Sequence, residues 1–310
     1  MARGRRRRDW ARNPSKVIRK MSTRRFFLNL ALLPILGFAV AWSANAQQDL
    51  QSAGPGQSSP QTPGTDLPQA PAPEKVQINF VEAGGSYQQL TNGFGDWSGG
   101  YALGVFATGK NVWNAEINGQ HEFGDSGVYF AAGDTYSFNP DWYASLTLGS
   151  SVGGFFWPRF RADAFLNRKW GARKQFITTL GYGFFASKDV HRDQSVFVGT
   201  TYYFRGPWIV EDGVRFNVSK PGVIFSPAGF VALTEGSNEH HYVTLNVGFG
   251  QEAYQLVGPT TVLARFPSQN MTITWRQWVG KSWGFNLVAN YYHSPFYERG
   301  GGSFGFFKQF

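Results

Sequence analysis

The sequence predicts an all-β fold, namely a transmembrane, antiparallel, up-and-down β-barrel of about 12 to 14 strands in a bacterial outer membrane. Apolar and polar residues alternate with period two throughout residues 76–310, as expected for strands with one apolar face. Many alternating segments are about 10 to 13 residues long, which suits strands that cross a bilayer at a tilt. Tryptophans also flank the tight turns at one end of these segments.

Residues 1–46 precede the predicted barrel and form a basic extension followed by a secretory signal. Residues 1–25 hold 11 of the 29 Lys and Arg and one of the 20 Asp and Glu, and the run 26–46 is uncharged. Small residues just before Gln47 complete the basic, apolar and cleavage regions of a signal peptide. We therefore predict cleavage between Ala46 and Gln47.

Two alternatives stay open for this region. The apolar run 26–42 is just long enough to span a bilayer as an uncleaved anchor, although Pro34 and the cleavage pattern favour removal. Translation begins at either Met1 or Met21, since the segment from Met21 already has the length of an ordinary signal peptide.

The net charge of +9 would ordinarily point to a nucleic-acid-binding protein. Without residues 1–46, however, 18 Lys and Arg face 19 Asp and Glu, and we expect no nucleic-acid partner. The chain has no cysteine, which excludes a disulfide scaffold, a thiolate metal site and a cysteine nucleophile. We expect no cofactor and no metal.

Residues 47–75 predict a flexible periplasmic tether. The segment contains six Pro together with Gln, Ser and Gly, and almost no large apolar side chain. Such a composition cannot bury enough surface to offset the entropy of ordering. The outer-membrane β-barrel is therefore expected to occupy residues 76–310.

The alternating segments assign one face to lipid and the other to the barrel lumen. In the segment 112–123, for example, Trp113 and Ile117 share one face while polar side chains share the other. Placing the apolar faces against lipid turns the polar faces inward. The resulting lumen-lining candidates are Asn114, Glu116, Asn118, Arg161, Asp163, Lys169, Glu211, Arg215, Asn246, Arg276, Asn286 and Asn290.

The connections between candidate strands alternate in length. Even connections such as Gly109-Lys110 are tight, whereas odd ones include the long segment Gln251–Gln269. Two odd turns, near Asp125 and near Pro221, are short and break the rule. Short periplasmic turns and longer outer loops are typical of outer-membrane barrels, so both termini are expected in the periplasm.

Aromatic residues predict an interfacial girdle and an assembly signal. Indoles beside the tight turns would lie half in lipid and half among headgroups; these are Trp113, Trp142, Trp170, Trp208, Trp278 and Trp283. The chain ends in Phe310, with Phe304 and Phe306 on the same strand face. A terminal aromatic on a final strand looks like the recognition signal of the barrel assembly machinery, although Lys308 stands where an apolar residue would be usual.

Four segments together resemble the YaiO family of outer-membrane β-barrels. They are GGSYQQLTNGFGDWSGGYALGV (Gly84–Val105), HEFGDSGVYFAAGDTYSFNPDWYASLTLGSS (His121–Ser151), Trp157-Pro158, and YERGGGSFGFFKQF (Tyr297–Phe310). The resemblance rests on turn and girdle patterns, so it implies fold and location more than activity. Some members and relatives carry helical tetratricopeptide repeats before the barrel and are associated with polysaccharide export. This chain has only the 29-residue tether there.

The leading functional hypothesis is a non-enzymatic barrel that forms or gates a narrow polar passage. An inner face rich in Asn, Gly and Tyr suits neutral, hydroxyl-rich cargo such as polysaccharide. The segment Gln251–Gln269 is either a plug in the barrel mouth or an exposed loop. The alternative is a closed structural or surface-interaction barrel. Expected partners are outer-membrane lipids and lipopolysaccharide, the barrel assembly machinery and polysaccharide.

A third hypothesis is an outer-membrane lipid A or phospholipid acyl hydrolase that uses His293 and Ser294, with Glu298 nearby. Such an enzyme needs a nucleophile within reach of a base. Adjacent residues on a strand point to opposite faces, which disfavours this pair. The turn residues His240 and His241 lack the carboxylate partners of a metal site, and we expect them to be solvated.

Overall fold

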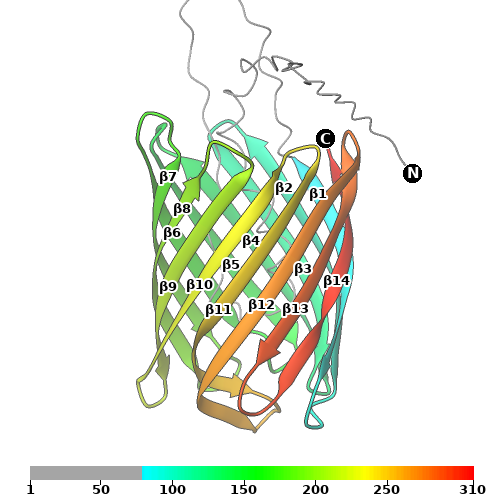
Figure 1. Ribbon diagram of the computed structural model, residues 1–310. Helices are drawn as coiled ribbons and strands as arrows, with labels where there is room; N and C mark the ends of the chain where they lie inside the picture. Colours follow the sequence, from blue (N-terminus) through cyan, green and yellow to red (C-terminus); the bar gives the residue numbers. More distant parts are fainter. Residues whose placement is uncertain (1–78) are drawn as a thin grey trace, which may run out of the picture.

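The computed structural model describes residues 79–310, which form one closed, fully antiparallel barrel of fourteen strands (Figure 1). This confirms the predicted fold class. The predicted signal peptide and tether lie outside the described residues. The strands are β1 (Phe80–Leu90), β2 (Asp96–Thr108), β3 (Asn111–Glu122), β4 (Asp125–Ser137), β5 (Trp142–Gly153), β6 (Phe160–Trp170), β7 (Phe176–Ala186), β8 (Arg192–Tyr203), β9 (Trp208–Lys220), β10 (Ile224–Ser237), β11 (His241–Leu256), β12 (Val262–Gly280), β13 (Trp283–His293) and β14 (Glu298–Gln309).

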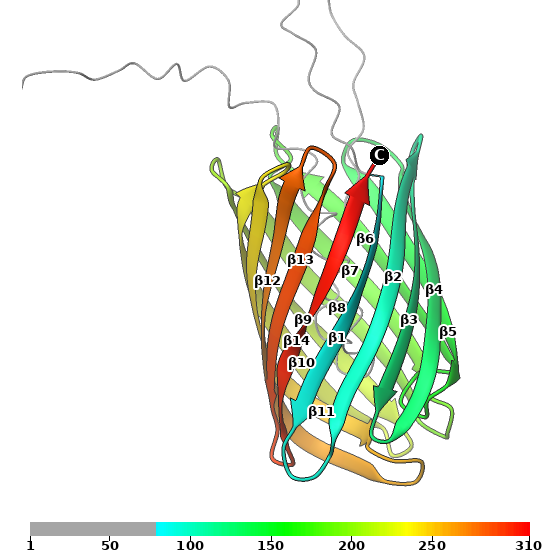
Figure 2. The same ribbon diagram turned by 90° about the vertical axis from the view of Figure 1, so that its right-hand side faces the viewer.

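The first and last strands close the barrel. Strand β1 pairs with β14 along its whole length, from Phe80 opposite Gln309 to Leu90 opposite Arg299, and the two strands lie side by side in Figure 2. An open edge in lipid would leave a row of backbone donors and acceptors without partners. Closure removes that edge. No helix in residues 79–310 is long and apolar enough to cross a membrane.

A belt of large apolar side chains covers the outer faces of the strands. Leu146 of β5, Leu180 of β7 and Val198 of β8 are all about half exposed, while their sequence neighbours on the opposite face are buried or half-buried. Apolar side chains on the outside and charged ones inside invert the pattern of a soluble domain. Such a surface requires an apolar solvent, and a lipid bilayer supplies it.

The two ends of the barrel differ. Both the start of β1 and the end of β14 lie at one end, which we call the terminal end (Figure 1). The turns there are tight, as at Gly109-Lys110 and Lys281-Ser282. The opposite end, which we call the loop end, carries the odd-numbered connections. Those at Phe123-Gly124 and at Pro221–Val223 are short, as expected from the sequence.

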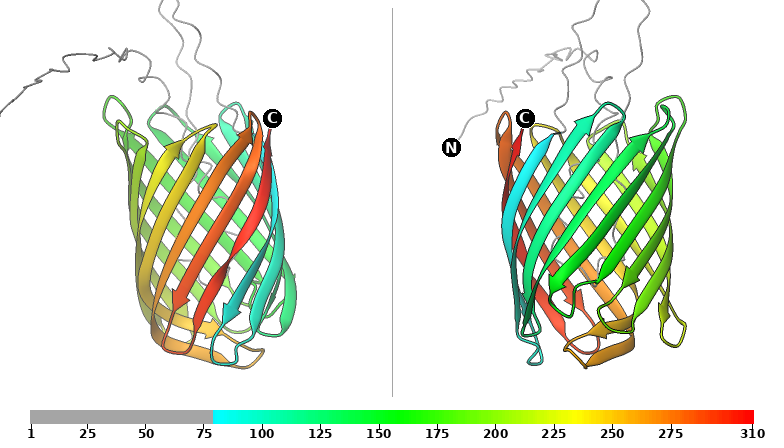
Figure 3. Two further views of the ribbon diagram at one scale, coloured as in Figure 1. Left: turned by 45° about the vertical axis from the view of Figure 1, so that its right-hand side comes forward. Right: turned by 180° about the vertical axis from the view of Figure 1, so that it is seen from behind.

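The segment Gln251–Gln269 forms neither a plain loop nor an internal plug. It extends strands β11 and β12, which at 16 and 19 residues are the longest of the barrel. The ladder skips the pair Ala253 and Arg265, and Arg265 has a positive φ of 55°. Beyond this irregularity the two strands bend and lie across the loop end (Figure 3). We call residues 253–264 the capping hairpin.

Candidate functional site

The barrel interior is of intermediate width, so the packing of its side chains determines whether a passage exists. Fourteen strands spaced about 4.8 Å apart and tilted by about 40° close at a backbone radius of roughly 14 Å. Barrels of eight strands are just filled by side chains, whereas those of about 16 to 18 leave an aqueous channel. The interior is therefore the first candidate site, and its loop-end mouth is the second.

All twelve lumen-lining candidates lie on the strand faces that point into the barrel. Asn118, Arg161, Asp163, Lys169, Glu211, Arg215, Arg276 and Asn286 are buried, Glu116, Asn246 and Asn290 are half-buried, and Asn114 is exposed. They come from β3, β6, β9, β11, β12 and β13. Period-two alternation is sufficient to place them because a strand leaves each side chain only two directions.

A buried ion pair joins β12 to β1 in the terminal half of the interior. The guanidinium of Arg276 contacts the carboxylate of Glu82 at 3.0 Å, and the two side chains are 1% and 0% exposed. The Tyr101 hydroxyl donates to Glu82 at 2.9 Å. Arg276 also lies 3.6 Å from the ring centre of Phe307. Glu82 was not among the residues predicted from the sequence, although its alternation with outward-facing Val81 is sufficient to place it inside.

Further contacts in the middle of the wall are partly polar and partly aromatic. Arg161 contacts Asp163 at 2.6 Å on β6, and Arg215 of β9 donates to the Ser195 hydroxyl at 3.0 Å. Beside them lies an apolar inner cluster of Phe165, Phe197, Phe230 and Ala232. The interior is thus less uniformly polar than the sequence analysis expected.

The charges that point inward are of both signs, with a modest acidic excess. Within the described strands, five basic and eight acidic side chains face the interior. The basic ones are Arg161, Lys169, Arg215, Arg276 and Arg299, and the acidic ones are Glu82, Glu116, Glu122, Asp125, Asp163, Asp193, Glu211 and Glu252. Such a wall presents both signs of charge to a solute.

The capping hairpin contacts one side of the mouth through Tyr254. Its hydroxyl donates to the Pro221 carbonyl at 2.5 Å, in the β9–β10 turn. Its ring lies 4.3 Å from the His191 ring, in the β7–β8 loop. Partial burial raises the pKa of Asp189, but hydrogen bonds from the His191 backbone and ring outweigh it and hold that pKa below its usual value. The carboxylate therefore stays charged and fixes the ring on which Tyr254 rests.

The opposite side of the mouth is apolar. Leu263 of the capping hairpin packs against a cluster of Leu90, Trp97, Tyr292 and Tyr297, and Gln255 donates to the Tyr297 hydroxyl. These residues belong to β1, β2, β13 and the β13–β14 loop. The hairpin consequently touches connections on both sides of the opening.

Five of the six predicted girdle tryptophans face outward at the terminal end. Trp113, Trp170, Trp208 and Trp283 are exposed and Trp142 is half-buried. The prediction for Trp278 is wrong. Strict alternation from Arg276 turns Trp278 inward, where its indole donates to Gln309 at 2.8 Å. Its proximity to a turn correctly predicted that Trp278 lies near the terminal end, but it did not determine which face of the strand Trp278 occupies.

The proposed hydrolase residues are not assembled. His293 faces outward and contacts Glu298 at 3.2 Å, whereas Ser294 is buried in the following turn and donates to the Tyr297 carbonyl at 3.1 Å. No hydrogen bond joins the two side chains among the described contacts. His241 contacts Glu235 at 3.0 Å, and residues 79–310 contain no group of three His, Asp or Glu placed to hold a metal ion.

A closed barrel with a lipid-facing apolar belt and a charged, aromatic interior defines an outer-membrane β-barrel protein. The chain belongs to the family of the YaiO membrane beta barrel domain, whose model matches residues 78–255. This confirms the resemblance found in the sequence. No curated protein shows significant sequence similarity to the chain.

Solved structures show the same fold at low sequence identity. The CymD monoaromatic hydrocarbon channel matches with a TM-score of 0.51 and 8% identity over 76% of this chain and 89% of that chain. The TodX deltaS2S3 mutant monoaromatic hydrocarbon channel matches with a TM-score of 0.52 and 10% identity over 76% and 91%. At such identities the likeness concerns the fold alone.

Proposed function

We propose that this protein forms a narrow outer-membrane passage for neutral, hydroxyl-rich solutes, with polysaccharide as its cargo class, and that the capping hairpin gates it. In this proposal the loop end faces outward and the terminal end faces the periplasm. The observation that carries the proposal is a hairpin laid across the mouth of a fourteen-stranded barrel and held at both sides of the rim. A purely structural barrel, through which no solute passes, does not need a hairpin across its mouth that is held by so few contacts.

The inner wall supports a neutral cargo. It carries both signs of charge, and some of these charges are held in pairs, namely Arg276 with Glu82 and Arg161 with Asp163. Amide, hydroxyl and aromatic side chains fill the positions between these pairs. A glycan presents hydroxyl groups and apolar ring faces, which amides and aromatic rings match without any net charge.

The attachment of the capping hairpin supports its proposed role as a gate. Its bend coincides with the positive φ of Arg265, a conformation that a non-glycine residue adopts at some cost. Outside the β11–β12 ladder, the hairpin is held by single hydrogen bonds from Tyr254 and Gln255, by the ring contact of Tyr254 with His191 and by the packing of Leu263. Each of these contacts contributes only about 1 kcal/mol, so the hairpin can lift while the barrel stays intact.

Planar-bilayer recordings test this proposal. We expect the intact protein to conduct in brief, infrequent openings, and a variant in which an Asn-Gly turn replaces residues 253–264 to conduct steadily. Replacement of the exposed Thr260 by Ser, at the hairpin tip, is the matched control and should behave as the parent. A barrel that stays silent in both intact and trimmed forms would refute the passage.

A closed surface-interaction barrel is the second candidate, and one observation favours it. The loop-end connections interlock through aromatic rings, including Tyr129 stacked on Trp157 at 4.9 Å and Phe123 against Phe94 at 6.1 Å. Such packing stiffens the rim. Liposome-swelling rates with neutral oligosaccharides separate the candidates, because only a passage admits them after the hairpin is trimmed.

The ends of the chain carry further proposals. We propose that residues 1–46 are removed on export and that residues 47–75 tether the barrel on its periplasmic side. Phe304, Phe306 and Phe310 face outward on the final strand, where the barrel assembly machinery and outer-membrane lipids, lipopolysaccharide among them, would meet them. Replacing Phe310 by Ala should lower the amount of folded barrel recovered from membranes, and an unchanged amount would count against the assembly role.

A further inference from the structure

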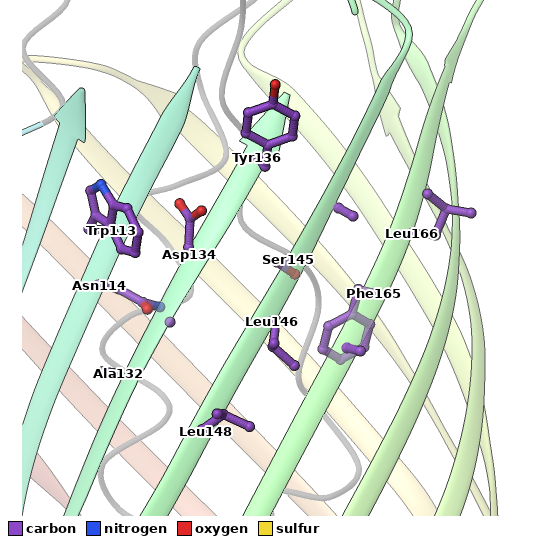
Figure 4. A pocket seen from close by; sticks show the side chains of 13 residues that line it. Trp113, Asn114, Ala132, Asp134, Tyr136, Ser145, Leu146, Leu148, Phe165 and Leu166 are labelled. Atoms are coloured by element: carbon purple, nitrogen blue, oxygen red, sulfur yellow. The ribbon is translucent and has the colours of Figure 1, made fainter. Parts of the chain in front are cut away.

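A lipid-facing groove crosses the outer wall of β3 to β6 in the terminal half of the barrel (Figure 4). It encloses about 720 Å³. Small side chains leave its floor low and leucines form its sides; the floor is Ala132, Ala144 and Ala164, and the sides are Leu146, Leu148 and Leu166. This shape suits a flexible hydrocarbon chain.

A carboxylate stands at the terminal-end margin of this groove. Asp134 lies on the outward face of β4, with Trp113 opposite it on β3 and Leu146 opposite it on β5. Its Oδ2 accepts a hydrogen bond from the Asn111 amide, while its buried Oδ1 has no donor in the described chain. A charged group on the lipid face is unfavourable, and a buried acceptor without a partner adds to that cost. No basic side chain of the described chain forms an ion pair with Asp134, so its charge is open to compensation by a cation from outside the barrel.

Two aromatic side chains flank the carboxylate. Trp113 is 50% exposed and Tyr136 is 39% exposed on the same outer face, and Figure 4 shows the Asp134 carboxylate between their rings. Aromatic faces attract cations electrostatically, and a carboxylate accepts hydrogen bonds from an ammonium group. Together they provide the chemistry that recognises a primary ammonium at the level of lipid headgroups.

The geometry points to a binding site for a phospholipid with a primary ammonium headgroup. The ammonium lies against Asp134 between Trp113 and Tyr136, and an acyl chain occupies the groove over Ala132 and Ala144. The ammonium thereby offsets the charge of Asp134, and the acyl chain covers the small floor residues. This site lies on the outer wall and is independent of the proposed passage.

A second outward carboxylate provides an internal control. Asp212 of β9 lies four residues from the terminal end of its strand, a depth comparable to that of Asp134. It already accepts a hydrogen bond from the Thr200 hydroxyl at 2.7 Å. Its cross-strand neighbours are Thr200 and Val231 rather than aromatic residues. Asp212 should therefore not bind an ammonium headgroup.

Native mass spectrometry of the full chain with added phosphatidylethanolamine or phosphatidylglycerol of identical acyl chains tests the site. We expect the parent to retain phosphatidylethanolamine roughly tenfold more strongly than phosphatidylglycerol. Asp134→Asn should abolish that preference, Trp113→Ala should reduce it, and Asp212→Asn should leave it unchanged. Thermal unfolding in lipid-free detergent reports separately whether each variant is folded.

Three results would overturn the assignment. Equal retention of the two lipids by the parent would show that the headgroup is not recognised. Equal loss of preference in Asp134→Asn and Asp212→Asn would show a general surface-charge effect. A change in the proportion of dimers with Asp134→Asn, without a change in bound lipid, would show that the groove binds a second protein copy.

Discussion

Replacing Glu82 by Gln tests whether the inner wall is locally dry. The substitution keeps the size of the side chain but removes the charge that faces Arg276 at 3.0 Å. At that distance the attraction is about 1.4 kcal/mol in bulk water and about 5.5 kcal/mol at an effective dielectric constant of 20. Because both side chains are almost fully covered, we expect a loss well above the lower figure. Removing one partner of a buried pair typically costs about 3 to 5 kcal/mol.

The assay is urea-induced unfolding from lipid vesicles, followed by tryptophan fluorescence. Glu82→Gln should lower the free energy of unfolding by about 3 to 5 kcal/mol, and adding Arg276→Met should restore most of it, since the uncompensated charge is then gone. Asp141→Asn removes one partner of the exposed pair with Lys174 and should cost less than about 1 kcal/mol. A loss as small as this for Glu82→Gln, or additive losses in the double variant, would refute the reasoning.

Three further predictions concern the gate, the β7–β8 loop on which it rests and the inward Trp278. Tyr254→Phe removes the hydrogen bond to Pro221 and should raise the open fraction in bilayers about fivefold; Tyr291→Phe, on the outer face, should not. The low pKa of Asp189 means that its contact with His191 contributes above the unfolded value of about 3.9 and is lost as pH falls through the folded value; openings should increase below about pH 4, and Asp189→Asn should abolish that step. Trp278→Phe should cost about 1 kcal/mol of stability through the lost bond to Gln309, whereas outward Trp283→Phe should change it by less than about 0.5 kcal/mol.

The sequence predicted the barrel and its faces because a strand offers only two side-chain directions. Contact with lipid favours apolar side chains on one of these two faces. Asn118, Asp163 and Arg215 could each be placed inward from their immediate neighbours alone. The closed pairing of β1 with β14 follows from the physics of an edge in lipid. The error at Trp278 arose where proximity to a turn was used in place of alternation.

Two features of the candidate sites could not be read from the sequence. The segment Gln251–Gln269 continues the strand pattern of β11 and β12, and only its contacts with Pro221 and Tyr297 show that it crosses the mouth. Asp134 interrupts the apolar face of β4, and a single polar residue in such a pattern gives no signal above ordinary variation. Its meaning depends on Trp113 and Asn111, which register brings from the neighbouring strand.

The measurement that bears most directly on the gated passage compares a trimmed hairpin with a tethered one. The chain has no native cysteine, so Tyr254→Cys with Val223→Cys allows a short bis-maleimide to tie the capping hairpin to the β9–β10 turn. We predict that this cross-link suppresses single-channel openings, whereas replacing residues 253–264 by a tight turn gives a steady conductance. Identical conductance in the tethered, intact and trimmed proteins would contradict the account.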